Sequence, residues 1–331
     1  MKKLIFAVIF VFLTLALSCT DGEVFDSTGG GWASVYIGGS YMDNGVERAC
    51  YWADGKRYGL NGYTVENITA VRGTVYAAGF YEDNGADKAC YWVNQKRYDL
   101  PGYSFALHWV YPFPNISVDR GDVYVCGAVE ESSLYGYWVN GVRREPQFSG
   151  VIRGVYAAGG LVYIVGSYTD SGIEKACYWV NGVRRELPNT LTGSHDFIQS
   201  FIFVQDNKVY TAGSFMNLTP SSVATSFWID GVQQKVFSAS DLIMAIAVSD
   251  GNIYMFMHND GVDTSLYVNG ELSGIDYGSP TNSSAALCVS NSKIYTSGSY
   301  LDNGEIKACY WVDGEQFFLD GYQARAIFVK E

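Results

Sequence analysis

The sequence predicts an all-β protein, a seven-bladed β-propeller in which each blade is a four-stranded antiparallel sheet. Of its 331 residues, 16% are aromatic and only 17% are charged. This composition favours strands and argues against a helical or a disordered chain. One unit of sequence recurs seven times, at a spacing typical of propeller blades. An apolar run at the C-terminus can complete the first blade and close the ring.

The N-terminus predicts export. Two basic residues, Lys2 and Lys3, precede the apolar residues 4–18, which are too few for a comfortable membrane span and typical of a signal peptide. Ser18-Cys19 resembles the bacterial lipobox, in which the cysteine is lipidated and becomes the new N-terminus. The alternative is an ordinary cleaved signal peptide with an incidental cysteine.

Three segments follow from this interpretation. We expect residues 1–18 to be a lipoprotein signal peptide. Residues 19–31, which begin with the lipidated Cys19, are polar and should form a flexible tether. Residues 32–331 should form the propeller.

Seven copies of one unit make up the propeller. Each copy has an aromatic residue before its last turn, and neighbouring copies of this residue are 39 to 49 residues apart. These residues are Trp52, Trp92, Trp138, Trp179, Trp228, Tyr267 and Trp311.

Each unit should form four strands joined by three hairpin turns. The third turn is Asn-Gly or Asp-Gly in six of the units, and these residues tolerate the positive φ angles of a two-residue hairpin turn. The first unit begins with its second strand at Ser34, so the C-terminal strand should complete it and protect the open edge. The innermost strands are expected at residues 68–71, 116–118, 155–158, 202–204, 245–248, 286–289 and 326–329.

Residues 45–52 and their copies resemble bacterial extracellular propeller repeats of the HAF type. In this chain, Ala-Cys-Tyr-Trp stands where those repeats have Ala-Phe-Leu-Trp, and their Leu-Gly end corresponds to Leu60-Asn61-Gly62. The resemblance implies an exported propeller. It implies no catalytic residues, because the shared motif is structural.

The cysteines and histidines do not form a recognisable reactive site in the sequence. Cys50, Cys90, Cys177 and Cys309 occupy one repeat position, and neighbouring blades should hold them too far apart for disulfides. We interpret them as small buried residues and expect no catalytic residue, cofactor or metal. The recurring turn aspartates could suggest calcium, but tight turns favour the same residues for backbone reasons; they are Asp43, Asp83, Asp170 and Asp302.

Candidate binding residues are those that interrupt the repeat. The longest departures are residues 101–115 and 188–201, both predicted as inter-blade loops, and residues 216–226, predicted as a turn. Loops of this kind carry function in many folds, and aromatic residues are enriched in binding hot spots. The alternative is that these aromatics only cap the ring. The candidates are His108, Trp109, Tyr111, Phe113, His195 and Asp196.

The sequence therefore predicts a lipid-anchored binding module of the bacterial cell envelope, at the outer membrane. It should recognise a protein or glycan partner through its inter-blade loops, and we expect it to be a monomer. A net charge of −12 argues against nucleic acid as a partner. A periplasmic scaffold for envelope assembly and a propeller enzyme acting on glycans are the alternatives.

Overall fold

The computed structural model describes residues 34–102, 114–128, 135–144, 150–188, 195–218, 221–238, 242–258, 264–274 and 286–330. These residues form strands and turns, and no helix among them could cross a membrane.

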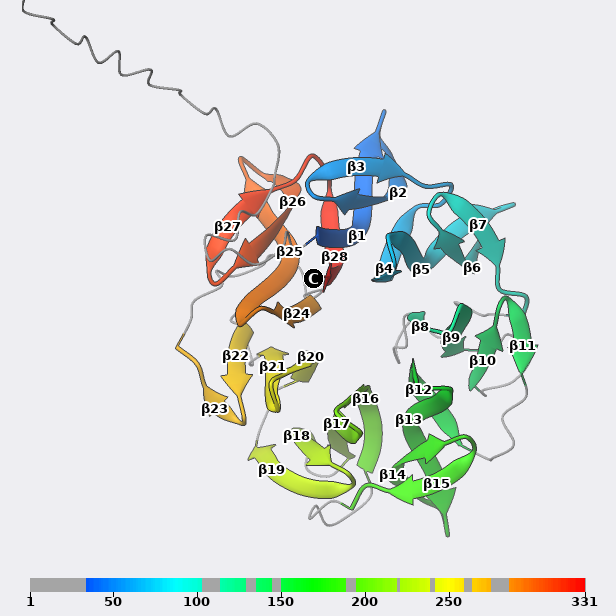
Figure 1. Cartoon of the computed structure of the whole chain (residues 1–331), viewed down its shortest axis with the longest axis vertical. Coiled ribbons are helices and arrows are strands. Elements are labelled where there is room, and N and C mark those ends of the chain that lie inside the picture. Colours follow the sequence, from blue (N-terminus) through cyan, green and yellow to red (C-terminus); the bar gives the residue numbers. More distant parts are fainter. Residues whose placement is uncertain are drawn as a thin grey trace, which may run out of the picture.

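Seven four-stranded antiparallel sheets stand around a centre (Figure 1), as the sequence predicts. From its innermost to its outermost strand, blade 1 consists of β28 (Gln323–Lys330), β1 (Ser34–Asp43), β2 (Val46–Ala53) and β3 (Lys56–Gly59). In the same order, blade 2 consists of β4 (Thr64–Val71), β5 (Thr74–Asp83), β6 (Ala86–Val93) and β7 (Lys96–Asp99), and blade 3 of β8 (Asn115–Asp119), β9 (Asp122–Ala128), β10 (Tyr135–Val139) and β11 (Val142–Arg144). Blade 4 consists of β12 (Val151–Ala158), β13 (Leu161–Asp170), β14 (Ile173–Val180) and β15 (Val183–Glu186). Blades 5 to 7 are β16 (His195–Gln205), β17 (Lys208–Leu218), β18 (Ser221–Ile229), β19 (Val232–Ser238); β20 (Leu242–Ser249), β21 (Asn252–His258), β22 (Thr264–Val268), β23 (Glu271–Leu272); and β24 (Ala286–Ser290), β25 (Lys293–Asp302), β26 (Glu305–Val312), β27 (Glu315–Phe318).

The antiparallel order gives the ring two faces. The loop face carries the connections between blades and the turns between the second and third strands of each blade. The turn face carries the turns between the first and second strands and between the third and fourth strands. Every predicted innermost strand lies within the innermost strand of a blade.

Two predicted loops are largely strand. Residues 195–201 belong to β16, whose backbone pairs with β17 from His195 onward. Residues 216–226 were expected to form a turn, but β17 continues to Leu218 and β18 resumes at Ser221. The hairpins of blade 5 are longer than the repeat suggests, so a boundary transferred from the other blades ends these strands too early.

The third turn of each blade is held by one repeated pair of hydrogen bonds. Its first residue, an Asn or Asp, has φ between 46° and 54°. The Oδ1 atom of this residue accepts the backbone N–H at the start of the second strand at 2.8–3.1 Å. Its own N–H donates to the carbonyl of that same residue at 2.7–2.9 Å. The seven residues are Asp54, Asn94, Asn140, Asn181, Asp230, Asn269 and Asp313. The recurring residue thus meets two needs, because it tolerates the turn and ties the third hairpin to the second strand.

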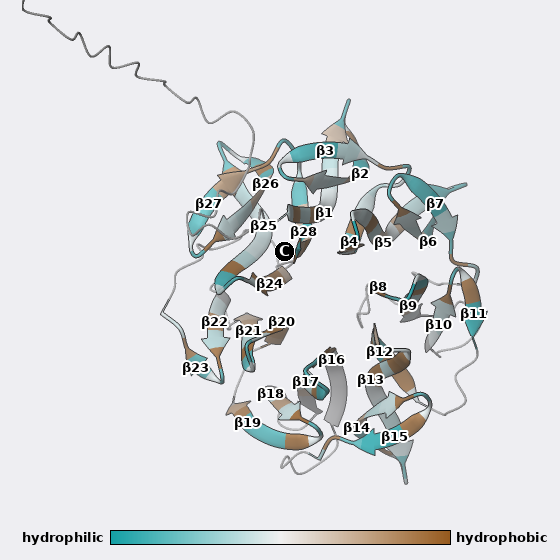
Figure 2. Cartoon of the chain, viewed as in Figure 1, coloured by the Kyte–Doolittle hydropathy of each residue, from teal (hydrophilic) through white to brown (hydrophobic). Residues whose placement is uncertain are grey.

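The core lies between neighbouring blades. Figure 2 shows hydrophobic residues along inner strands such as β20 and β24, and hydrophilic residues along outer strands such as β15 and β23. The tryptophans of the repeat are buried, and Trp92 packs with residues of blades 1 and 2. Gly62, from the preceding connection, lies against it, and a Cβ atom there would come within 2.6 Å of the Trp92 ring. This contact explains why residue 62 is a glycine.

Blade 1 joins the two ends of the propeller, as predicted. Val35 pairs with Val329 and Ile37 pairs with Ile327, so β28 supplies the innermost strand. Ile327 and Val329 are buried, and burying each such side chain stabilises the fold by about 1.5–3 kcal/mol.

Removing residues 324–331 should destabilise the whole ring, because β1 loses its partner and becomes an exposed edge. We expect thermal unfolding at a temperature lower by roughly 10 °C or more, or aggregation in place of a reversible melt. A synthetic peptide of residues 323–331 added to the truncated chain should restore part of the loss. Unchanged melting of the truncated chain would refute the closure.

Candidate functional site

The structure describes only part of the predicted binding patch. Cys19 and four candidates lie outside the described residues: His108, Trp109, Tyr111 and Phe113. The prediction that His195 and Asp196 lie in a loop is wrong, because they begin β16 and pair with Asn217 and Met216. Since β16 starts at the loop face, both residues still lie at that end of blade 5.

Five described innermost strands have a β-bulge at this same end. In β16 the extra residue is Ile198, and its bulge lies two residues nearer the loop face than the others. In β4, β12, β20 and β28 the bulge opposes one common repeat position of the second strand, and the extra residue is Glu66, Arg153, Met244 or Arg325, respectively. Bulges redirect a side chain and are frequent next to functional sites. Three of the five extra residues, Glu66, Arg153 and Arg325, are charged, although the flanking positions are mostly apolar.

Glu66 and Arg325 form an ion pair between blades 1 and 2. The Arg325 Nη1 atom lies 3.4 Å from the Glu66 carboxylate, whose side chain is only 4% exposed. Thr64 donates a hydrogen bond of 3.0 Å to Glu66, and Arg325 also donates to the side chain of Gln323. Burial raises the pKa of Glu66, while Arg325 and Thr64 act in the opposite direction.

Blade 4 carries a second ion pair, whose buried arginine occupies the equivalent position. The guanidinium of Arg153 is 3.9 Å from the carboxylate of Glu174, and its side chain is 6% exposed. Ser167 donates a hydrogen bond to the same carboxylate. The corresponding serine of blade 1, Ser40, donates to Glu47 at 2.6 Å.

Tyr63 extends this polar region into the connection between blades 1 and 2. Burial, followed by the nearby Asp87 and Glu66 carboxylates, raises the pKa of the Tyr63 hydroxyl well above its usual range. The hydroxyl is therefore protonated at neutral pH and can donate a hydrogen bond. Its ring stacks on Phe80 with centroids 6.1 Å apart.

Together these residues form a fixed set of charges and hydrogen-bond donors around the loop-face ends of the innermost strands. Such a set suits the recognition of a polar or charged partner, since its groups are already held in place. We did not predict it from the sequence. The detectable feature was one charged residue at a single repeat position within otherwise apolar strands, as in Val65-Glu66-Asn67-Ile68 and Ala324-Arg325-Ala326-Ile327.

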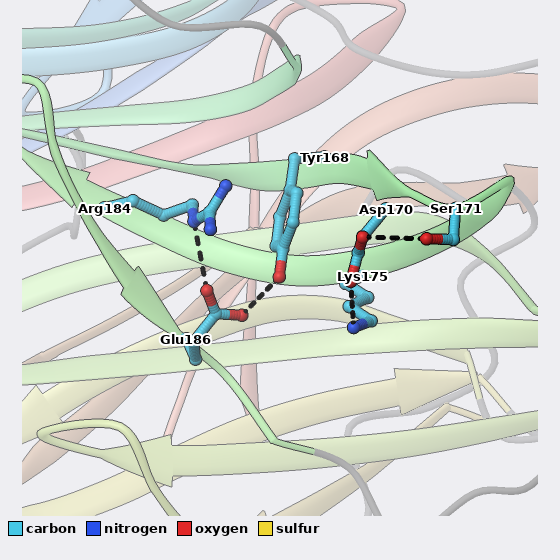
Figure 3. A network of polar contacts seen from close by, with 6 residues as sticks. All are labelled: Tyr168, Asp170, Ser171, Lys175, Arg184 and Glu186. Carbon is cyan, nitrogen blue, oxygen red and sulfur yellow. Dashed lines mark hydrogen bonds and ion pairs between the residues drawn. The ribbon is translucent and has the colours of Figure 1, made fainter.

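Polar contacts on the outer strands belong instead to the scaffold. In blade 4, Tyr168 donates to Glu186 at 2.9 Å, and Arg184 lies 3.0 Å from the same carboxylate (Figure 3). The Arg184 guanidinium also covers the Tyr168 ring at 3.7 Å. The same stacking joins Arg97 to Tyr81 and Arg57 to Tyr41. An arrangement repeated in three blades is more readily explained by blade structure than by a unique site.

The recurring turn aspartates have contacts within their own hairpins. Lys175 and Lys307 lie 2.6 Å from Asp170 and Asp302, and hydrogen bonding to Lys175 lowers the pKa of Asp170. The next residue, Ser171 in blade 4, has a positive φ of 54°, as a two-residue turn requires. The part of the chain that the structure describes contains no cluster of three or more potential metal ligands.

The six cysteines of the described residues are free, as expected. Cys50, Cys90, Cys126, Cys177 and Cys309 are buried, and Cys288 is partly buried. Burial raises their pKa values, to about 12 for Cys126 and about 11 for Cys288 and Cys309.

Known proteins resemble this chain only in fold. No protein-family model matches it, and no curated protein matches its sequence. The β-propeller domain of the Trilobed protease from Pyrococcus furiosus has a TM-score of 0.47 and 17% identity, over 77% of this chain and 84% of that chain. Apo AztD from Citrobacter koseri has a TM-score of 0.48 and 11% identity, over 90% and 99%. Trypanosoma rangeli sialidase in complex with sialic acid has a TM-score of 0.42 and 10% identity, over 83% and 56%. These proteins have different names and roles, so the likeness leaves the function of this chain open.

The buried thiols should resist modification while the protein is folded. At pH 8 they are protonated, and the thiolate is the reactive species. We expect little labelling by iodoacetamide in the native state, with Cys288 reacting first, and full labelling after denaturation, both read by mass spectrometry. Rapid native labelling of Cys50 or Cys177 would contradict the burial.

Removing Arg325 should be costly because it leaves the Glu66 carboxylate buried without its cation. We expect Arg325→Met to lower the free energy of unfolding by about 3 kcal/mol at pH 7, and Glu66→Gln in the same chain to restore most of the loss. The raised pKa sets the sign of the pH dependence. Below the pKa that Glu66 has in the unfolded state, its carboxyl is protonated in both states and the Arg325→Met variant loses little stability. The loss of stability grows as pH rises above that value, and it is complete once pH has passed the raised pKa of the folded state.

Denaturant unfolding at pH 4 and pH 7 measures both effects. Arg48→Met is the matched control, because Arg48 is exposed and lies 3.9 Å from the exposed Asp43. Equal losses for the two arginine variants would contradict a special role for the buried pair.

Proposed function

We propose that this protein is a lipid-anchored binding module of the bacterial cell envelope that recognises a protein or glycan partner through its loop face. Lipid on Cys19 would hold it to the outer membrane, with residues 20–31 as a tether. The body would belong with the HAF-type extracellular repeats that residues 45–52 resemble.

The main support for this proposal is the contrast between the repeated scaffold and the loop face. The third turns, the buried tryptophans and the Arg–Tyr stacks recur from blade to blade. The Glu66–Arg325 and Arg153–Glu174 pairs are specific to their blades and lie at the loop-face ends of the innermost strands. A ligand must distinguish one part of a ring from another, and only residues that differ between blades allow this.

Ion pairing of these carboxylates favours binding over hydrolysis. A glycosidase needs two carboxyl groups placed to act as acid and as base or nucleophile. Glu66 and Glu174 instead neutralise arginines and accept hydrogen bonds from Thr64 and Ser167. Six free cysteines also fit an exported protein in a compartment with weak disulfide formation.

The test is binding of the purified chain to envelope material. Trp109→Ala with Tyr111→Ala should abolish binding to isolated peptidoglycan, to a glycan array or to immobilised outer-membrane proteins, whichever the unaltered chain binds. The melting temperature should stay unchanged. Gln234→Ala, at an exposed position of the outermost strand of blade 5, is the control and should bind normally.

If the chain with Trp109→Ala and Tyr111→Ala still binds, the proposal that the loop face recognises the partner is wrong. Protease treatment of whole cells, followed by detection of the chain, separates exposure at the cell surface from a periplasmic scaffold.

A further inference from the structure

The turn face has an ordered distribution of charge at one repeat position. This position is the first residue of the outermost strand, next to the third turn, and its side chain is exposed in every blade. In order from blade 1 to blade 7, it is occupied by Lys56, Lys96, Val142, Val183, Val232, Glu271 and Glu315. Two positive blades, three apolar blades and two negative blades therefore follow one another around the ring.

If a second ring presents the same order in the opposite direction, each positive blade of one ring lies opposite a negative blade of the other. A two-fold axis in the plane of the ring can pass through blade 4 and between blades 7 and 1. It exchanges blade 1 with blade 7, blade 2 with blade 6, and blade 3 with blade 5. A second copy stacked on the turn face would then place Lys56 opposite Glu315 and Lys96 opposite Glu271. The valines would meet one another, and they are 55%, 57% and 62% exposed.

A second set of turn-face residues has the same symmetry. The turn between the first and second strands begins in blades 2 to 7 with a residue whose φ lies between 48° and 63°. The same axis places Arg72 opposite Asp250 and Arg120 opposite Asp206. These residues are Arg72, Arg120, Gly159, Asp206, Asp250 and Asn291.

The residues that begin the second strands continue the pattern. Asp122 in blade 3 would face Lys208 in blade 5, and both are exposed. Leu161 in blade 4, which is 39% exposed, would lie at the axis beside Val183. Three repeat positions therefore agree on one axis.

We propose that the protein forms a homodimer in which two rings stack through their turn faces around this axis. The interface is isologous, since each patch meets the patch that complements it. Valines and Leu161 supply apolar contact along the axis through blade 4, and charge pairs on both sides set the rotational register. A dimer departs from the monomer that the sequence alone led us to expect.

Some of these groups also have contacts within their own ring, but they stay exposed. Arg120 donates to the Gly159 carbonyl at 2.7 Å, and its side chain is 69% exposed. Glu271 lies 2.9 Å from Lys235, but its side chain is 85% exposed and can accept a second donor. Asp54 and Asp313 would face each other as like charges. Each of these carboxylates accepts a backbone N–H of its own blade, from Val35 and Ile294, which offsets part of their repulsion.

The dimer has a consequence for the loop faces. They point away from each other, so a dimer offers two binding surfaces. Ser34 of each copy lies in blade 1, beside the point where the axis passes between blades 7 and 1. Both chains therefore enter their rings on the same side, which is compatible with attachment of both to one membrane.

Charge exchange tests the dimer and its register together. The protein, purified in a mild detergent, should have about twice its own monomer mass in sedimentation equilibrium, with the monomer mass taken from denaturing mass spectrometry of the same sample. Lys56→Glu with Lys96→Glu should raise the dimer dissociation constant by about 100-fold, because four cross-ring pairs change from attraction to repulsion. Glu271→Lys with Glu315→Lys should do the same. An equimolar mixture of these two variants should form a heterodimer, since every rim pair is again opposite in charge.

Lys175→Glu with Lys307→Glu reverses two lysines on the loop face and is the matched control, expected to remain dimeric. Circular dichroism confirms that all variants are folded. A monomeric unaltered chain would overturn the proposal, as would a dimer that survives both charge reversals or variants that fail to pair when mixed.

Discussion

Closure of the ring by β28 against β1 is the contact on which the rest of the structure depends. It joins Val329 to Val35, residues from opposite ends of the propeller, and so converts a row of seven sheets into a ring without open ends. The same strand carries Arg325, which reaches Glu66 in blade 2. Blade 1 is therefore tied to its neighbour through the strand that closes it. The buried charge pair on the loop face exists only when the ring is closed.

Within that ring, each blade is standardised by its third turn. Asn94 and Asn181, for example, bind the N–H groups of Val75 and Val162 in the same way, although 87 residues separate the two turns. An Asn or Asp at this position fixes the hairpin through its own geometry and one hydrogen bond, which contributes about 1 kcal/mol. Residues beside the turn, such as Lys96 and Val183, are not required to make this hydrogen bond, so they can differ between blades.

The sequence allowed the blade count, the innermost strands and the closure to be predicted, because each rests on a repeated local feature. Trp92 and Asn94 each have a physical reason to recur. The bulges were not predicted, because a bulge is a mismatch in register between two strands and Glu66 shows only as a charge between apolar neighbours. His195 was misplaced because the repeat sets strand length by analogy, and the hairpins of blade 5 are longer. Aromatic residues such as Trp109 interrupt the repeat, so no repeated feature determines their positions.

The two faces satisfy their charges differently. On the loop face, Arg325 and Arg153 have carboxylate partners inside the same ring, so their charges are balanced within one molecule. On the turn face, a blade sequence copied seven times would place the same charge in all blades, and two such faces would repel. Divergence to lysine in blades 1 and 2 and to glutamate in blades 6 and 7 removes that repulsion only for one rotational register. Arg72 with Asp250 and Arg120 with Asp206 select the same register. Since no core packing requires these exposed residues to agree, contact with a second copy accounts for their order more directly than the stability of a single ring.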